Sequence, residues 1–155
     1  MPAQPAERLV KPLIAVTATF TAELVREPLE FWIEELALEL SVRFAPYNQV
    51  FQQLLDPEGM LARNPGGVNV VLLRFEDWVR FRNGSPVSPD DLEQNVRNLV
   101  SALRAAANTA TSPFLVCICP ASPEALSQPS RRTLLTRLES LLVSSAADLG
   151  TVHVT

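Results

Sequence analysis

The sequence predicts an α/β protein of three layers, α/β/α, with a five-stranded parallel sheet of order 2-1-3-4-5. Short runs rich in β-forming residues alternate with segments of helical periodicity from residue 13 onward. Two of these runs, residues 68–75 and 114–120, are almost continuously apolar, which is typical of strands covered on both faces. The connections are short, and this favours crossovers between parallel neighbours.

The first half of the chain contains three predicted strands, over residues 13–20, 41–45 and 68–75. Between the first two, Pro28 is expected to open a helix that runs to residue 40. Trp32 lies on the apolar stripe of this helix, so we expect it to be buried against the sheet. Asn48 is the expected N-cap of a second helix, which ends before Asp56-Pro57, and residues 58–67 are expected to form a loop.

The second half begins with a connector over residues 78–87, in which Asn83-Gly84 predicts a turn. Ser88-Pro89 followed by two aspartates is typical of a helix start, and the apolar stripe continues to Ala107. A strand over 114–120, a loop over 120–130 and a helix through Leu134 and Leu142 follow, with Gly150 as the expected C-cap. The fifth strand is predicted at 151–155.

Length and composition favour one domain over residues 12–155, preceded by a flexible tail or linker at 1–11. A net charge of -4 and a pI near 5.0 argue against nucleic acid as a partner, because a phosphate-backbone binder needs a basic face. No apolar run approaches the roughly 18–20 residues of a membrane span. Cys117 and Cys119 are expected to be buried free thiols, which indicates a reducing, cytoplasmic location.

Polar and aromatic side chains follow the predicted strands at their carboxyl ends. In a parallel sheet these ends share one edge, and sites form there where the strand order reverses. Tyr47 and Trp78 are expected to form the apolar walls of one concave site. We call the predicted set the recognition rim; it consists of Thr19, Phe20, Thr21, Tyr47, Asn48, Gln49, Arg74, Glu76, Asp77 and Trp78.

The sequence lacks a complete catalytic set. His153, the single histidine, lies within the last predicted strand, and no G-x-S-x-G motif is present. The loop after the first strand has neither G-x-G-x-x-G nor a Walker A motif, and clusters of metal-ligating residues are missing. We therefore expect no catalytic residues, no metal and no cofactor. Three threonines in residues 17–21 leave flavin binding as an alternative.

Four segments resemble the N-terminal portion of FkbH-like proteins, and the resemblance covers roughly residues 12–155, nearly all of the chain. The segments are T-A-T-F-T at 17–21, F-A-P-Y-N-Q at 44–49, L-L-D-P at 54–57 and V-V-L-L-R-F-E-D-W at 70–78. The resemblance implies an SGNH-like α/β domain that precedes a haloacid-dehalogenase-like domain. In that family the second domain carries an Asp-x-Asp-x-Thr motif and transfers a glyceryl unit to an acyl carrier protein.

Because this chain lacks Asp-x-Asp-x-Thr, the family's catalytic residues cannot be assigned to it, whereas the rim motifs can. The resemblance therefore implies a non-catalytic accessory domain of a polyketide or nonribosomal peptide system, the N-terminal part of a longer FkbH-like region. The implied partners are the adjoining haloacid-dehalogenase-like domain and a carrier protein or its phosphopantetheine arm. A degenerate SGNH-type esterase or acyltransferase that uses Thr19 or Thr21 is the alternative.

Overall fold

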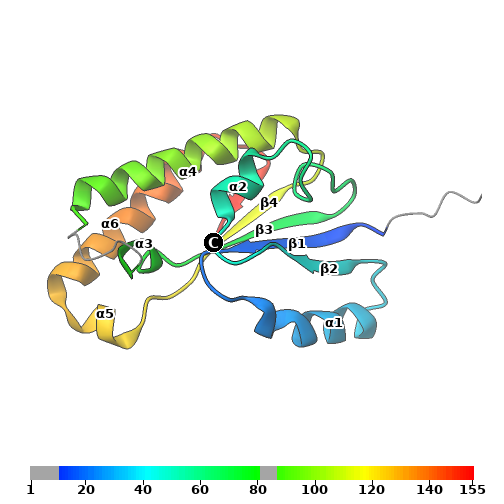
Figure 1. The fold of residues 1–155 in the computed structure, drawn as a ribbon, viewed down its shortest axis with the longest axis horizontal. Coiled ribbons are helices and arrows are strands. Elements are labelled where there is room, and N and C mark those ends of the chain that lie inside the picture. The colour runs from blue at the N-terminus through cyan, green and yellow to red at the C-terminus, as the bar shows by residue number, and fades with distance from the viewer. Residues whose placement is uncertain (1–10, 81–86) are drawn as a thin grey trace, which may run out of the picture.

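The computed structural model describes residues 11–80 and 87–155, and five parallel strands form its sheet (Figure 1). Their order is β2-β1-β3-β4-β5, which confirms the predicted fold class and strand order. The strands are β1 (Leu13–Ala18), β2 (Ser41–Phe44), β3 (Val68–Leu73), β4 (Phe114–Ile118) and β5 (Val152–Val154).

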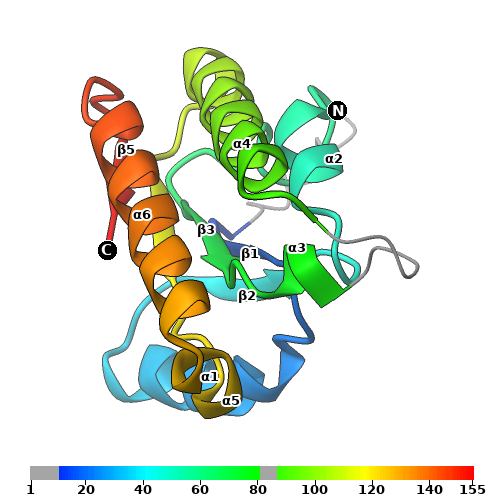
Figure 2. The ribbon, with the colours of Figure 1, turned by 90° about the vertical axis from the view of Figure 1, so that its left-hand side faces the viewer.

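Helices lie on both sides of this sheet. Their bounds are η1 (Glu23–Val25), α1 (Arg26–Glu35), α2 (Val50–Leu55), α3 (Asp77–Arg80), α4 (Pro89–Thr109), α5 (Pro123–Ser127) and α6 (Pro129–Ala146). The chain steps from β1 to β2 in one direction and from β2 through β3 and β4 to β5 in the other. Right-handed crossovers therefore place α1 on one face and α2, α4 and α6 on the opposite face, as Figures 1 and 2 show.

The hydrophobic core lies between the sheet and the layer of α2, α4 and α6. The long helix α4 supplies leucines at helical spacing, and α6 crosses beside it. The sheet supplies alternate residues of its central strands, because successive side chains of a strand point to opposite faces. Fully buried members of this core include Val71, Leu73, Leu92, Leu99, Leu103, Phe114, Val116, Leu138 and Leu142.

A buried asparagine joins the starts of β1 and β3. Asn64 Oδ1 accepts a hydrogen bond from the amide of Leu13 at 2.8 Å, and its Nδ2 donates to the Leu13 carbonyl at 3.0 Å. The same Nδ2 donates to Oδ1 of Asn69 at 3.0 Å, and Asn69 donates to the carbonyl of Leu61 at 2.9 Å. This amide clamp fixes the predicted loop at 58–67 to the amino edge of the sheet.

The prediction that Trp32 is buried is wrong, because its side chain is 58% exposed. Helix α1 faces the sheet with Leu29 and Ile33, which are half-buried, and it packs on the edge strand β2. Trp32 lies to one side of that contact line. The helix also starts at Arg26 rather than at Pro28 and ends at Glu35, five residues earlier than expected.

Truncating Trp32 should therefore have little effect on folding. We expect Trp32→Ala to lower the free energy of unfolding by less than about 1 kcal/mol, measured by urea denaturation. Leu138→Ala, at a fully buried position of α6, is the control and should cost about 2–5 kcal/mol. Equal losses in the two variants would show that Trp32 is packed in the native protein.

Several helix boundaries also differ from the prediction. The N-cap of α2 is Gln49 without a side-chain cap, and Asn48 instead adopts a left-handed conformation with φ of 53°. Within the expected loop at 120–130, α5 is present, and α6 begins at Pro129 and has Ala147 rather than Gly150 at its C-cap. The expected turn at 83–84 and the tail, apart from residue 11, lie outside the described residues.

Candidate functional site at the carboxyl edge of the sheet

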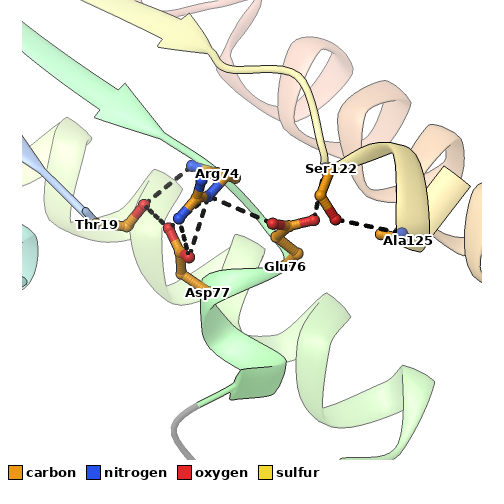
Figure 3. Close-up of polar contacts among 6 residues, drawn as sticks. All are labelled: Thr19, Arg74, Glu76, Asp77, Ser122 and Ala125. Atoms are coloured by element: carbon orange, nitrogen blue, oxygen red, sulfur yellow. Dashed lines mark hydrogen bonds and ion pairs between the residues drawn. The ribbon is translucent and has the colours of Figure 1, made fainter. Parts of the chain in front are cut away.

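The carboxyl ends of β1 and β3 are joined through Thr19, which directly follows β1. The amide of Thr19 donates to the carbonyl of Leu72 at 3.1 Å and extends the ladder between the two strands. Its side chain is buried, and Oγ1 accepts a hydrogen bond from the amide of Arg74 at 3.0 Å. The same hydroxyl donates to Oδ2 of Asp77 at 3.0 Å (Figure 3).

Arg74 and Asp77 form a bidentate ion pair. The Arg74 Nε lies 3.1 Å from both carboxylate oxygens, and a terminal nitrogen lies 2.7 Å from Oδ1. Asp77 is 2% exposed, whereas Arg74 is 27% exposed and holds its guanidinium 5.1 Å from the centre of the Phe20 ring. The hydrogen bond to Asp77 raises the pKa of Arg74.

Glu76 connects this pair to the chain beyond β4. One carboxylate oxygen lies 3.7 Å from Nε of Arg74, and the other accepts a hydrogen bond from the amide of Ser122 at 2.8 Å. The Ser122 hydroxyl in turn accepts from the amide of Ala125 at 3.2 Å and caps α5 (Figure 3). Side chains after β1 and β3 and the loop after β4 thus form one network, which we call the edge network: Thr19, Arg74, Glu76, Asp77 and Ser122.

The one base that the edge network places within reach of the Thr19 hydroxyl is the carboxylate of Asp77, and Arg74 binds both oxygens of that carboxylate. The Thr19 oxygen already accepts one hydrogen bond, and its proton points at a carboxylate held by Arg74. His153 lies in β5, three strand spacings from β1, which corresponds to about 14 Å. Nucleophilic attack by a threonine requires a free base within hydrogen-bond reach. The network therefore connects strands and neutralises buried charge.

The structure brings five of the predicted rim residues together, namely Thr19, Phe20, Arg74, Glu76 and Asp77. Trp78, which follows Asp77 in α3, is half-buried, lies edge-on to Phe75 at 5.4 Å and packs against the core. The other four rim residues are more peripheral: Thr21, Tyr47 and Asn48 are exposed, and Gln49 is half-buried at the start of α2.

A cleft of about 590 Å³ opens beside the edge network, and Glu76 is its single residue from the predicted rim. Its other walls come from α3, α4, α5 and α6 and include Val79, Leu92, Ser122, Arg131, Leu134 and Leu135. The sequence prediction missed this cleft because residues 120–130 were expected to be a loop. Ser122-Pro123 carries the same capping signal as Ser88-Pro89 and could have identified α5.

Cys117 and Cys119 are free, as predicted, but they are half-buried rather than core residues. Burial raises the pKa of both thiols, and for Cys119 the neighbouring thiol of Cys117 contributes as well. The thiolate is the reactive form.

We expect iodoacetamide to alkylate Cys117 and Cys119 more slowly than a free cysteine at neutral pH, with the rate of alkylation rising only at higher pH. Urea-unfolded protein is the control, and equal rates in the folded and unfolded chain would contradict the raised pKa.

Two further findings concern the described residues as a whole. Within residues 11–80 and 87–155, no group of three or more histidine, cysteine or acidic side chains is placed to hold a metal ion. Over the same residues, no helix has both the length and the apolar character needed to cross a bilayer.

Comparison with known proteins gives a match in structure only. No family model and no curated protein sequence matches this chain. It is similar to the crystal structure of the N-terminal part of the protein BF1531 from Bacteroides fragilis, which contains a phosphatase domain and is complexed with Mg. The TM-score is 0.67 at 12% identity, and the match covers 92% of this chain and 39% of the other. This chain therefore has the same fold as part of that structure and spans about two fifths of its length.

Proposed function

We propose that this chain is a non-catalytic accessory domain that supports glyceryl transfer to an acyl carrier protein by an adjoining haloacid-dehalogenase-like domain. The structural match supports this proposal most directly. Nearly the whole chain matches part of a structure that contains a phosphatase domain, and the match covers less than two fifths of that structure. A longer protein that holds both this fold and a phosphatase domain would fit the arrangement that the resemblance to FkbH-like proteins implies.

The polyketide or nonribosomal peptide context rests on the motifs that resemble the FkbH-like family. The segment at 44–49 covers the end of β2 and the turn that follows, so Tyr47 lies at the carboxyl edge, 49% exposed. The segment at 70–78 covers β3 and most of the edge network. Both motifs therefore belong to the edge at which open parallel sheets bind their ligands.

The edge network supports a binding role over a catalytic one. The Thr19 hydroxyl both donates and accepts a hydrogen bond within the network, and Arg74 binds the carboxylate of Asp77 in a bidentate ion pair. The adjacent cleft is better suited to a ligand, since its walls are apolar at Val79, Leu92 and Leu135. Arg131 also lines the cleft and would pair with the phosphate of a phosphopantetheine arm. We assign the arm to this cleft and Tyr47 to contact with the adjoining domain.

The proposal is tested by glyceryl loading of the carrier protein in the intact multidomain protein, followed by mass spectrometry. Tyr47→Ala and Trp78→Ala should each slow loading several-fold while circular dichroism remains unchanged. Val143→Ala, at an exposed apolar position of α6, is the matched control and should load normally. Undiminished loading by both folded rim variants would overturn the role of the rim.

A further inference from the structure

The two faces of the sheet are covered very differently. The side chains of Val71 and Leu73 in β3 and of Phe114 and Val116 in β4 point into the core and are buried. The alternate residues of the same strands point to the opposite face, where they are half-buried. We call these alternate residues, Val70, Leu72, Leu115 and Cys117, the open face.

The open face is a continuous apolar surface. The strand register pairs Val70 with Leu115 and Leu72 with Cys117, so the four side chains form two adjacent rows. On this side the structure describes η1 and α1, which packs on β2 at the far edge of the sheet, and the short helix α5 beyond the carboxyl ends of the strands (Figures 1 and 2). A parallel sheet is normally covered on both faces, because its side chains are apolar on both. Among residues 11–80 and 87–155, however, no helix forms a layer over β3 and β4 on this side.

Helix α1 borders the open face with two exposed apolar side chains. Glu30 and Glu34 line a hollow beside Ser41 and Val42 of β2. Trp32 and Leu36 lie on the opposite flank of the helix, since they are offset from that pair by two residues. A right-handed crossover turns this flank toward β1 and β3. Both side chains are more than half exposed, so the apolar surface continues from the sheet onto α1.

The charge beside the open face is strongly negative. Residues 23–39 contain six glutamates against one arginine, Arg26, a net charge of -5. A helix packed beside α1 would lie about 10 Å away, comparable to the screening length in physiological salt. A second copy of this chain would bring its own acidic segment to the same place and would be repelled. A positively charged helix would be attracted.

We propose that the open face binds an amphipathic α-helix with an aliphatic face and a net positive charge, contributed by the adjoining domain. The source of the helix rests on the proposed function, whereas the chemistry of the surface rests on this chain alone. Leucines at helical spacing would cover Leu72 and Leu115, and the edge of the helix would contact Trp32. Lysine or arginine side chains of the bound helix would be attracted by the net negative charge of residues 23–39.

The test uses the full chain with Cys119→Ser, so that Cys117 on the open face is the single thiol. Two synthetic 18-residue peptides share leucines at i, i+3, i+4 and i+7, with lysine at the remaining positions of one and glutamate in the other. The lysine peptide should slow labelling of Cys117 by a methanethiosulfonate reagent at neutral pH about tenfold or more, relative to the chain without peptide. The glutamate peptide should protect it less than about twofold.

Variants locate the binding surface. Leu115→Lys and Trp32→Ala should abolish protection, and Trp32→Ala keeps the test valid if the lysine variant fails to fold. Val143→Lys, at an exposed position of α6 on the other side of the sheet, is the control and should retain protection.

Three outcomes would overturn the inference. They are no protection by either peptide, equal protection by both, and a dimer in sedimentation whose Cys117 is protected without peptide. The third would identify a second copy as the occupant. Loss of carrier loading in the Tyr47 variant is independent of these results, so failure of the open face and failure of the proposed function are distinguishable.

Discussion

Arg74→Met should be among the most destabilising substitutions at the carboxyl edge, with a loss of about 3–5 kcal/mol in the free energy of unfolding. The variant leaves the carboxylate of Asp77 buried, with Thr19 as its remaining hydrogen-bond donor in the edge network. It also removes the positive charge beside Glu76 and the contact with the Phe20 ring. Urea denaturation monitored by circular dichroism measures the loss.

Two variants control for this explanation. Arg104→Met breaks a similar bidentate pair with Asp148, but that pair is exposed, so no measurable change is expected. The double variant Arg74→Met with Asp77→Leu removes both charges of the pair and should be more stable than Arg74→Met alone. If the stability lost in the double variant equals the sum of the losses in Arg74→Met and in Asp77→Leu, the two residues do not act as a unit.

Gly67→Ala should disrupt the hydrogen bonds between Asn64 and Leu13 at the amino-terminal edge of the sheet. A Cβ at this position would lie 2.2 Å from the carbonyl oxygen of Leu13 and 2.3 Å from Oδ1 of Asn64. The backbone cannot move aside without breaking the hydrogen bonds that hold β1 to Asn64. We expect a loss of about 3 kcal/mol or more, from overpacking together with unsatisfied buried amide groups.

Gly150→Ala is the matched control, because nothing lies within 4 Å of a Cβ there. Its melting temperature should equal that of the unmodified protein within error. If the melting temperature of Gly67→Ala equals that of Gly150→Ala, the hydrogen bonds of Asn64 to Leu13 do not form in solution.

The parallel sheet was predictable because strand and helix patterns alternate along the whole chain, and the predicted strand order is the default for such folds. The strands of the open face show the limit of this reasoning. Residues 68–75 are apolar on both sides, so the pattern predicts cover on both faces, whereas the structure covers only one of them fully. Trp32 was predicted to be buried because it lies on the apolar stripe of its helix. Such a stripe does not reveal whether other elements cover the side chain, and Trp32 is exposed in the structure.

At the candidate site, the predicted rim included four of the five residues of the edge network, all except Ser122, but the sequence did not predict their pairing. Proximity of the loops after β1 and β3 follows from the strand order. That Thr19 would donate to Asp77, and that Arg74 would close on the same carboxylate, depends on the short helix α3, which has no periodicity to detect. The cleft depends on α5, whose single turn lies within a proline- and serine-rich segment.

The central claim is that this domain binds rather than catalyses. Its most direct test is to measure the hydrolysis of acyl-thioesters and of p-nitrophenyl acetate by the purified chain. The edge network predicts a rate equal to that of buffer, because the Thr19 hydroxyl has no free base and Thr21 is exposed to solvent. Turnover above buffer that disappears in Thr19→Ala or Thr21→Ala would contradict the account and favour a degenerate esterase.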